Sequence, residues 1–200
     1  MNETVRIFFV SAIPEFGDGT RARVAIVRTG TFRYRGKDIT LTVKDFEDMA
    51  KNLREYRAGE LAFDYDHGTA VGETIDERMA AGWKPKDAPL EIERYADQDG
   101  GILWSLVDLT PRAADYARNK EIRFCSAEFS KHYFHPEAKK DVGTYLHAVA
   151  LTNRPFQEKL PGLVLMSEQA AALCEAMRSE KTEGRVVVGK AGKRFYGAGE

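Results

Sequence analysis

The sequence contains little cysteine, no long hydrophobic run and no excess of either charge. Its two cysteines, Cys125 and Cys174, have neither a CxxC nor a Cys/His spacing, so no disulfide framework or zinc site is predicted. Basic and acidic residues number 30 and 31, and the net charge of −1 gives no electrostatic basis for nucleic-acid binding. No apolar stretch approaches the roughly 18 residues of a membrane span, and the apolar run 7–10 is too short for a signal peptide. We therefore expect a cytoplasmic protein, in a cell or in an infected host.

Short strands dominate what the sequence does contain. Runs rich in β-branched and aromatic residues, separated by Gly, Pro and Asp clusters, predict strands, and one hairpin is predicted over 29–42. With 200 residues and 43% hydrophobic content, the chain suits one domain with a real core. Many short strands with a few helices predict an α+β barrel or sandwich. The predicted strands cover 5–13, 22–27, 60–67, 80–83, 89–95, 102–109, 121–130 and 143–152.

Three helices are predicted. Thr42 is the expected N-cap of a helix over 44–56, whose apolar residues follow one helical face. The pair Thr110-Pro111 opens a second helix, because proline favours the first helical position. A third helix is expected at 167–179, within a C-terminal part that ends in a flexible tail.

A serine–histidine pair is the first candidate for chemistry. Such a mechanism needs a hydroxyl close to an imidazole, a third group that orients the imidazole, and donors for the oxyanion. His67 ends a strand-like run after Asp64 and Asp66, and Ser126 lies within an apolar strand. Taken alone, His67 also suits an ordinary surface histidine, and Ser126 a serine bonded to the backbone. No GxSxG motif is present, so a hydrolase of the α/β-sheet type lacks support.

A metal site is the rival interpretation of the same residues. Asp64, Asp66 and His67 offer two carboxylates and an imidazole, and His132 or His135 would complete the coordination shell. The spacing matches no known ligand motif. A metal-dependent hydrolase therefore stays open as an alternative to the serine mechanism.

Five segments, in order, resemble the Mu-like phage I protein family, which are prohead proteases. The resemblance covers roughly 25–165, and its most specific parts are the Asp-Tyr-Asp-His and Ala-Leu-Thr-Asn-x-Pro runs. The matching segments are FDYDH at 63–67, AAGW at 80–83, WSLVDLTPRAADY at 104–116, IRFCSAEF at 122–129 and AVALTNRPF at 148–156.

The resemblance implies a fold, a role and partners. The wider group is similar in fold to herpesvirus assemblins, so we expect a β-barrel of seven or eight strands flanked by helices, with a protease domain at 1–165 and the helix and tail at 166–200. It implies a capsid-maturation serine protease that cleaves the scaffold, and itself, inside the assembling prohead in the host cytoplasm. The partners would be the scaffold and major capsid proteins, with a homodimer or higher oligomer left open. No cofactor, metal, membrane or direct nucleic-acid contact is expected.

By position, the family's histidine falls on His67 and its serine on Ser126. The place of the third catalytic residue falls on Ala148, which cannot orient an imidazole. We therefore expect its neighbour His147 to take this role, although strand alternation aims His147 at the other face unless a bulge intervenes. Asn153, Asp64 and Asp66 stay open as orienters.

One departure from the family pattern and one further oxyanion candidate complete the prediction. Ala127 stands where family members commonly have proline, and alanine keeps a backbone N–H that could donate to an oxyanion. Arg154 is a further candidate for oxyanion stabilisation. The alternative function is a catalytically inactive head-assembly or scaffold-associated protein.

Overall fold

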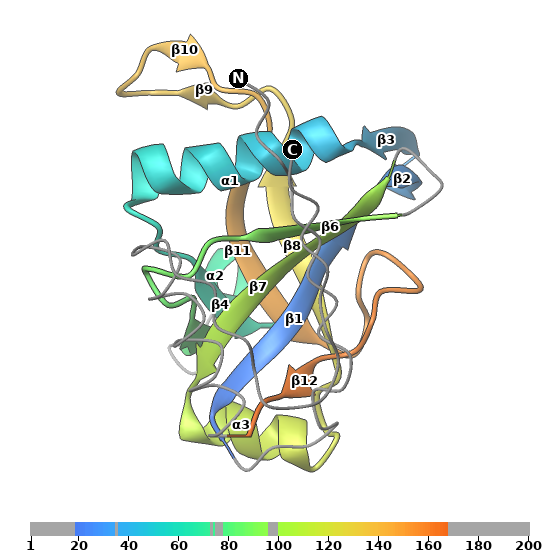
Figure 1. The fold of residues 1–200 in the computed structure, drawn as a ribbon, viewed down its shortest axis with the longest axis vertical. Coiled ribbons are helices and arrows are strands. Elements are labelled where there is room, and N and C mark those ends of the chain that lie inside the picture. Colours follow the sequence, from blue (N-terminus) through green and yellow to red (C-terminus); the bar gives the residue numbers. More distant parts are fainter. Residues whose placement is uncertain (1–18, 35, 73, 75–77, 96–99, 168–200) are drawn as a thin grey trace, which may run out of the picture.

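The computed structural model describes residues 19–34, 36–72, 74, 78–95 and 100–167. Its centre is one curled sheet of eight strands with helices at its ends and side (Figure 1). The predicted strand over 5–13 lies outside the described residues, and so does the helix at 167–179 apart from its first residue. None of the helices in the described ranges is long and apolar enough to cross a membrane.

The main sheet is mixed, and only the pairing of β4 with β11 is parallel. In spatial order its strands are β12 (Val164–Leu165), β1 (Arg21–Arg28), β7 (Gly101–Leu109), β5 (Ala80–Trp83), β4 (Ala62–Tyr65), β11 (Tyr145–Thr152) and β8 (Phe124–Ser130), and β6 (Glu91–Arg94) pairs with the first half of β7. The two hairpins are β2 (Gly30–Tyr34) with β3 (Lys37–Leu41), and β9 (Phe134–His135) with β10 (Lys140–Asp141).

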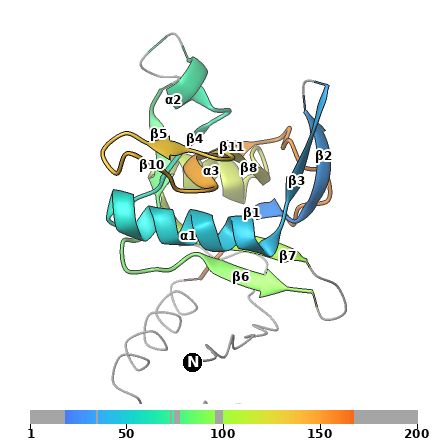
Figure 2. The same cartoon turned by 90° about the horizontal axis from the view of Figure 1, so that it is seen from above.

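The helices are α1 (Val43–Arg57), α2 (Gly68–Val71) and α3 (Pro111–Arg118). α1 lies across the upper end of the sheet in Figure 1, and the β2–β3 hairpin stands beside its first turn in Figure 2. The buried Phe46, Met49 and Leu53 of α1 belong to the main core, as the helical spacing predicts. At the start of α3 the Thr110 hydroxyl accepts a hydrogen bond from the Ala113 N–H at 3.3 Å.

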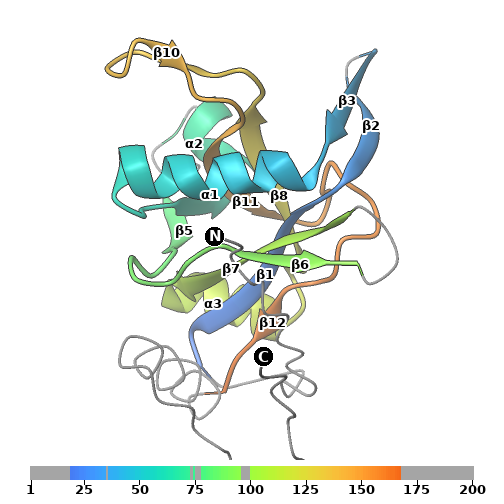
Figure 3. The same ribbon diagram turned by 45° about the horizontal axis from the view of Figure 1, so that its top comes forward.

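The predicted α+β class is confirmed, and the predicted barrel is confirmed only in part. The sheet curls into a half-barrel (Figure 3), and among the described strands no backbone ladder joins β8 to β1. Side chains of β1 and β8 nevertheless line one small recess at this gap, and both strands contribute to the main core. An assemblin-like identity for this half-barrel stays a prediction.

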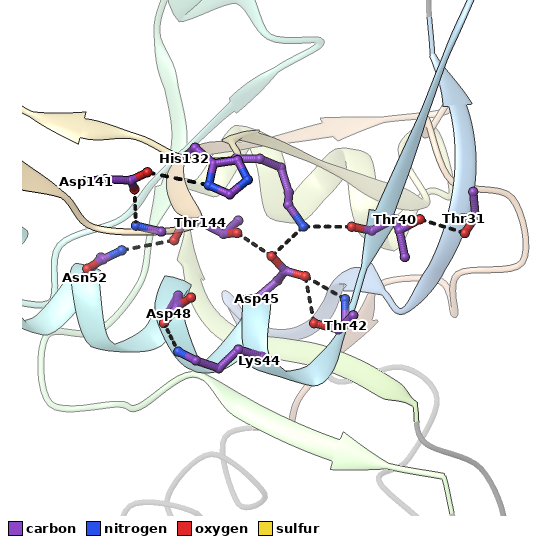
Figure 4. Close-up of polar contacts among 12 residues, drawn as sticks. Thr31, Thr40, Thr42, Lys44, Asp45, Asp48, Asn52, His132, Asp141 and Thr144 are labelled. Carbon is purple, nitrogen blue, oxygen red and sulfur yellow. Dashed lines mark hydrogen bonds and ion pairs between the residues drawn. The ribbon is translucent and has the colours of Figure 1, made fainter.

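A buried polar network ties the start of α1 to the segment that leads into β11 (Figure 4). The Asp45 carboxylate accepts hydrogen bonds from the Thr42 backbone N–H at 2.7 Å and from the Thr144 hydroxyl. The Lys131 ammonium lies 2.8 Å from the same carboxylate and also donates to the Thr40 carbonyl at 2.8 Å. Asn52 of α1 donates to the Thr144 carbonyl at 3.0 Å. These contacts fix the end of β11 at which His147 lies.

Candidate functional site

His67 lies at the point where β4 ends and the short helix α2 begins. Both Asp66 and His67 have a left-handed backbone, with φ of 48° and 63°, which is uncommon for residues other than glycine. The Asp66 N–H donates to the Leu151 carbonyl at 3.1 Å, so β11 holds the start of this turn. The two left-handed residues turn the chain away from the strand direction, and the His67 side chain is half-buried there.

Three neighbouring rows of side chains cross the strands β4, β11 and β8. In the two outer rows, Phe63 pairs with Val149 and Tyr65 with Leu151, and these side chains pack into the main core. The middle row consists of Asp64, Ala150 and Ser126. Successive residues of a strand point to opposite faces of a sheet, so the middle row points away from the core that the outer rows enter. Asp64 and Ser126 therefore lie on the outer face of the sheet, on either side of Ala150.

This register brings the strand that carries His67 close to the nucleophile candidate. Strands lie about 4.8 Å apart, so the Cα atoms of Asp64 and Ser126 are about 10 Å apart. His67 follows Asp64 by three residues. The hydrogen bonds of the described chain include none between His67 and Ser126, so the predicted pair is brought to one region of the sheet without direct contact.

Ser126 is nearly enclosed, with only 5% of its surface exposed. Its Oγ accepts a long hydrogen bond of 3.5 Å from the Phe156 backbone N–H. Cys125, the neighbouring residue, points to the opposite face and into the core, where burial raises the pKa of its thiol. Ser126 borders a small recess between β1, β8 and the chain that follows β11. The recess is lined by Ile26, Val27, Ser126, Ala127, Phe129, Phe156, Gln157 and Leu160.

His147 is the extra residue of a β-bulge in β11. The pairing with β8 shifts between Leu146 and Ala148, so His147 has no directly opposite partner. Tyr145 pairs with Ser130, which has the same facing as Ser126 because the two are four residues apart on β8. Ala148 already lies on the outer face, so strict alternation would put its neighbour His147 on the core face. Because of the bulge, His147 lies on the outer face together with Ser126.

The imidazole of His147 engages a different serine. Its Nε2 lies 2.9 Å from the Ser130 Oγ. Ser130 lies four positions after Ser126, which is about 13 Å along β8. In this arrangement His147 contacts neither Ser126 nor His67, and its role as the third catalytic residue stays a prediction.

The surroundings of His147 favour its neutral form. Burial lowers the pKa of the imidazole below its usual value of 6.5, although the Glu128 carboxylate opposes this effect and the Arg57 charge adds to it. Arg57, at the end of α1, also donates to the His147 carbonyl, which stabilises the bulge. The Tyr133 and Tyr145 rings lie 5.2 and 5.0 Å from the imidazole, centroid to centroid. A neutral imidazole at hydrogen-bond distance from a hydroxyl is able to accept its proton.

The other orienter and oxyanion candidates have different surroundings. The Asn153 amide accepts from the Arg123 N–H at 3.1 Å and donates to the Glu121 carbonyl, so it holds the chain that precedes β8. The Arg154 side chain is exposed. Asp64 is 1% exposed.

The residues named for a metal site do not gather in the described ranges. No cluster of three or more His, Cys, Asp and Glu side chains suited to a metal ion occurs there. His132 lies 3.5 Å from Asp141 in an exposed pair (Figure 4), and the buried His135 stacks on Tyr56 with a centroid distance of 4.2 Å.

The comparison with known proteins identifies the family. A model of the Mu-like prophage I protein, N-terminal domain, matches residues 24–164, which is more than half of the chain. This chain belongs to the Mu-like prophage I protein family. No curated protein and no solved structure matches it. As a member of this family, the chain is phage-related, and the matched region contains both His67 and Ser126.

Sequence reasoning missed two residues of this I-protein site. Ser130 and Glu128 follow Ser126 at intervals of two, so period-two alternation on β8 was a signal that all three share one face. The contact of Ser130 with His147 depends on the bulge in β11, for which the sequence contains no glycine or other marker.

Proposed function

We propose that this I-family chain is a serine endopeptidase of phage head maturation, with Ser126 as the nucleophile and His67 as the general base. Its substrates would be the capsid scaffold and the chain itself, within the assembling prohead. The observation that carries the proposal is the middle row of the sheet, in which Ser126 and the β4 residue Asp64 flank Ala150 on one face. It is supported by the family match, which spans both residues.

The chemistry follows from these positions. The Ser126 Oγ attacks the carbonyl carbon of the scissile peptide while the His67 imidazole takes the hydroxyl proton. The carbon–nitrogen bond then breaks, and the proton on His67 passes to the leaving amine. Water, deprotonated by the same imidazole, hydrolyses the acyl-enzyme and restores the Ser126 hydroxyl. Before the first step, the imidazole has to move into hydrogen-bond distance of the hydroxyl, and apo sites are often looser than complexes.

Co-expression with the scaffold and major capsid proteins tests the proposal. Ser126→Ala should abolish processing, and His67→Ala should lower it by at least about a hundredfold, as expected for loss of a general base. Ser130→Ala is the matched control, because Ser130 lies on the same strand and face, and processing should continue there. Unimpaired processing in Ser126→Ala would remove Ser126 from the mechanism.

The same control addresses a second candidate pair. The contact of 2.9 Å between Ser130 Oγ and His147 Nε2 has the geometry of a nucleophile with its base. If processing is lost in Ser130→Ala and kept in Ser126→Ala, this pair is the catalytic one. If neither serine matters, the alternative of an inactive head-assembly protein is the better description.

A further inference from the structure

A loop covers Ser126, and its two ends meet at one residue. This loop, called the strap here, is residues 153–163, which follow β11 and lead to β12 beside β1 and β8 (Figure 1). At its start the Asn153 side chain accepts from the Arg123 N–H at 3.1 Å. At its end the Leu163 N–H donates to the Arg123 carbonyl at 2.7 Å. The strap is thus a surface loop whose two ends lie close together.

The middle of the strap is held down by one amide side chain. Gln157 is 3% exposed, and it pairs with the backbone of Arg28 as a neighbouring strand would. The Arg28 N–H donates to the Gln157 Oε1 at 2.7 Å, and the Gln157 Nε2 donates to the Arg28 carbonyl at 3.1 Å. The Arg28 guanidinium adds a hydrogen bond of 3.0 Å to the Glu158 carbonyl. These three bonds join the strap to β1 across the opening of the half-barrel.

Apolar contacts complete the closure on both sides of Gln157. The Phe156 ring makes edge contacts with Phe32 and Tyr34 of the β2–β3 hairpin, with centroid distances of 6.0 and 5.1 Å. Leu160 is 6% exposed, within a small cluster that includes Ala25 and Trp104. The middle of the strap therefore packs on β1, β7 and the hairpin, whereas its base is bonded to the chain before β8.

The closed strap is incompatible with attack by Ser126. A substrate carbonyl carbon has to come within about 3–3.5 Å of the Ser126 Oγ. The Phe156 backbone N–H already lies there and donates to the Ser126 Oγ at 3.5 Å, and Ser126 as a whole is 5% exposed. We infer that the strap is a built-in cover that keeps Ser126 latent, and that the substrate chain takes its place on β8 once the Gln157 latch opens. This inference rests on the proposed function for its biological meaning.

Access to position 126 can be measured without any catalysis. In a Ser126→Cys background, alkylation of the introduced thiol by iodoacetamide reports how often the strap opens, with peptide mass spectrometry separating it from the buried Cys125. Gln157→Ala removes two buried hydrogen bonds and should raise the alkylation rate by at least about tenfold. The matched control is Asn52→Ala, because Asn52 is equally buried and also makes two hydrogen bonds to backbone groups, remote from the strap. Asn52→Ala should change the alkylation rate at position 126 by no more than about twofold.

Two results of this experiment would overturn the inference. One is a thiol at position 126 that reacts as fast with the intact strap as in Gln157→Ala. The other is an equal rise in Gln157→Ala and Asn52→Ala, which would mean general loosening instead of a latch.

Labelling of the native serine by a small fluorophosphonate separates this inference from the proposed function. If Gln157→Ala speeds alkylation of the introduced thiol and also labelling of Ser126, both proposals stand. If alkylation speeds up but Ser126 is never labelled, the cover is real and the peptidase is not. If Ser126 is labelled equally with and without Gln157, the peptidase stands and the cover is refuted.

Discussion

Asp64 and Ser126 lie on either side of Ala150 in one row of the outer sheet face, although they are 62 residues apart in the chain. Both are almost fully buried, at 1% and 5% exposure. The relationship depends on a parallel pairing of β4 with β11 and an antiparallel pairing of β11 with β8. It places a carboxylate and a hydroxyl on a common surface, with the smallest chiral side chain between them.

Ala150→Val should therefore impair the site more than the fold. The added methyl groups fill the space between Asp64 and Ser126, and overpacking of a buried position costs about 1–3 kcal/mol of unfolding free energy. Ala148→Val is the matched control, since Ala148 lies on the same face but pairs with Glu128. We expect Ser126 labelling by a fluorophosphonate to fall at least tenfold in Ala150→Val only. Equal labelling of the two variants would contradict this prediction.

His147 should make the protein less stable in mild acid. The pKa of His147 is about 6.5 in the unfolded chain and lower in the folded protein. Between these two pKa values the unfolded chain therefore binds more protons than the folded one. The stabilising contribution is complete above about pH 6.5 and declines as the pH falls below it. Urea unfolding at pH 7.5 and 5.5 should show this decline, and His147→Gln should reduce it. An equal decline in His147→Gln and in the unchanged protein would contradict this prediction.

Asp45 should dominate the stability of the α1 end of the molecule. Burial raises the pKa of its carboxyl, but hydrogen bonds from Lys131, Thr144 and Thr42 outweigh this effect, so the pKa lies below its usual 3.8. The contribution is complete above pH 3.8 and is lost as the pH falls through the lower folded-state pKa. At pH 7, Asp45→Asn should lower the unfolding free energy by about 1–3 kcal/mol.

Asp48→Asn is the comparison for that measurement. Within the described ranges Asp48 forms an ion pair with the exposed Lys44 four residues earlier on α1, an arrangement worth roughly 0.3–0.5 kcal/mol. Denaturant unfolding of both variants should therefore separate them clearly. Similar losses would mean that the network in Figure 4 adds little beyond ordinary surface pairing.

The thiol of Cys125 should be inert in the folded protein. It points into the core and burial raises its pKa, so the reactive thiolate is scarce at neutral pH. Iodoacetamide should leave it unmodified under native conditions and modify it in 6 M urea. Cys125→Ser buries a hydroxyl among apolar groups and should cost about 1–3 kcal/mol of stability. Rapid modification of Cys125 in the native protein would show that its side chain does not point into the core.

The sequence was sufficient to predict most elements, because their signals are local. The apolar spacing of Phe46, Met49 and Leu53 marks α1, and the apolar run of β7 marks a strand that is almost entirely buried. The fold class follows from the number and shortness of the strands. Elements with weak local signals, such as the two-residue β12, were not predicted.

The arrangement of the candidate site could not be predicted in the same way. Neighbours across a sheet are set by register, and the row from Asp64 to Ser126 combines two pairings between segments far apart in the chain. The bulge at His147 is stabilised by Arg57 from α1, which is another long-range contact. The strap depends on Gln157 finding the backbone of Arg28, and amide side chains give no pattern that identifies such a partner.

The left-handed turn at Asp66 and His67 has an implication for directed selection. Glycine is the residue that this backbone conformation favours, and holding other residues there costs of order 1–3 kcal/mol each. A library at position 67 that is screened for folding alone should therefore accept glycine and asparagine readily. If a screen for head assembly instead returns only histidine at position 67, this residue is retained for the function of its side chain and not for the stability of the turn.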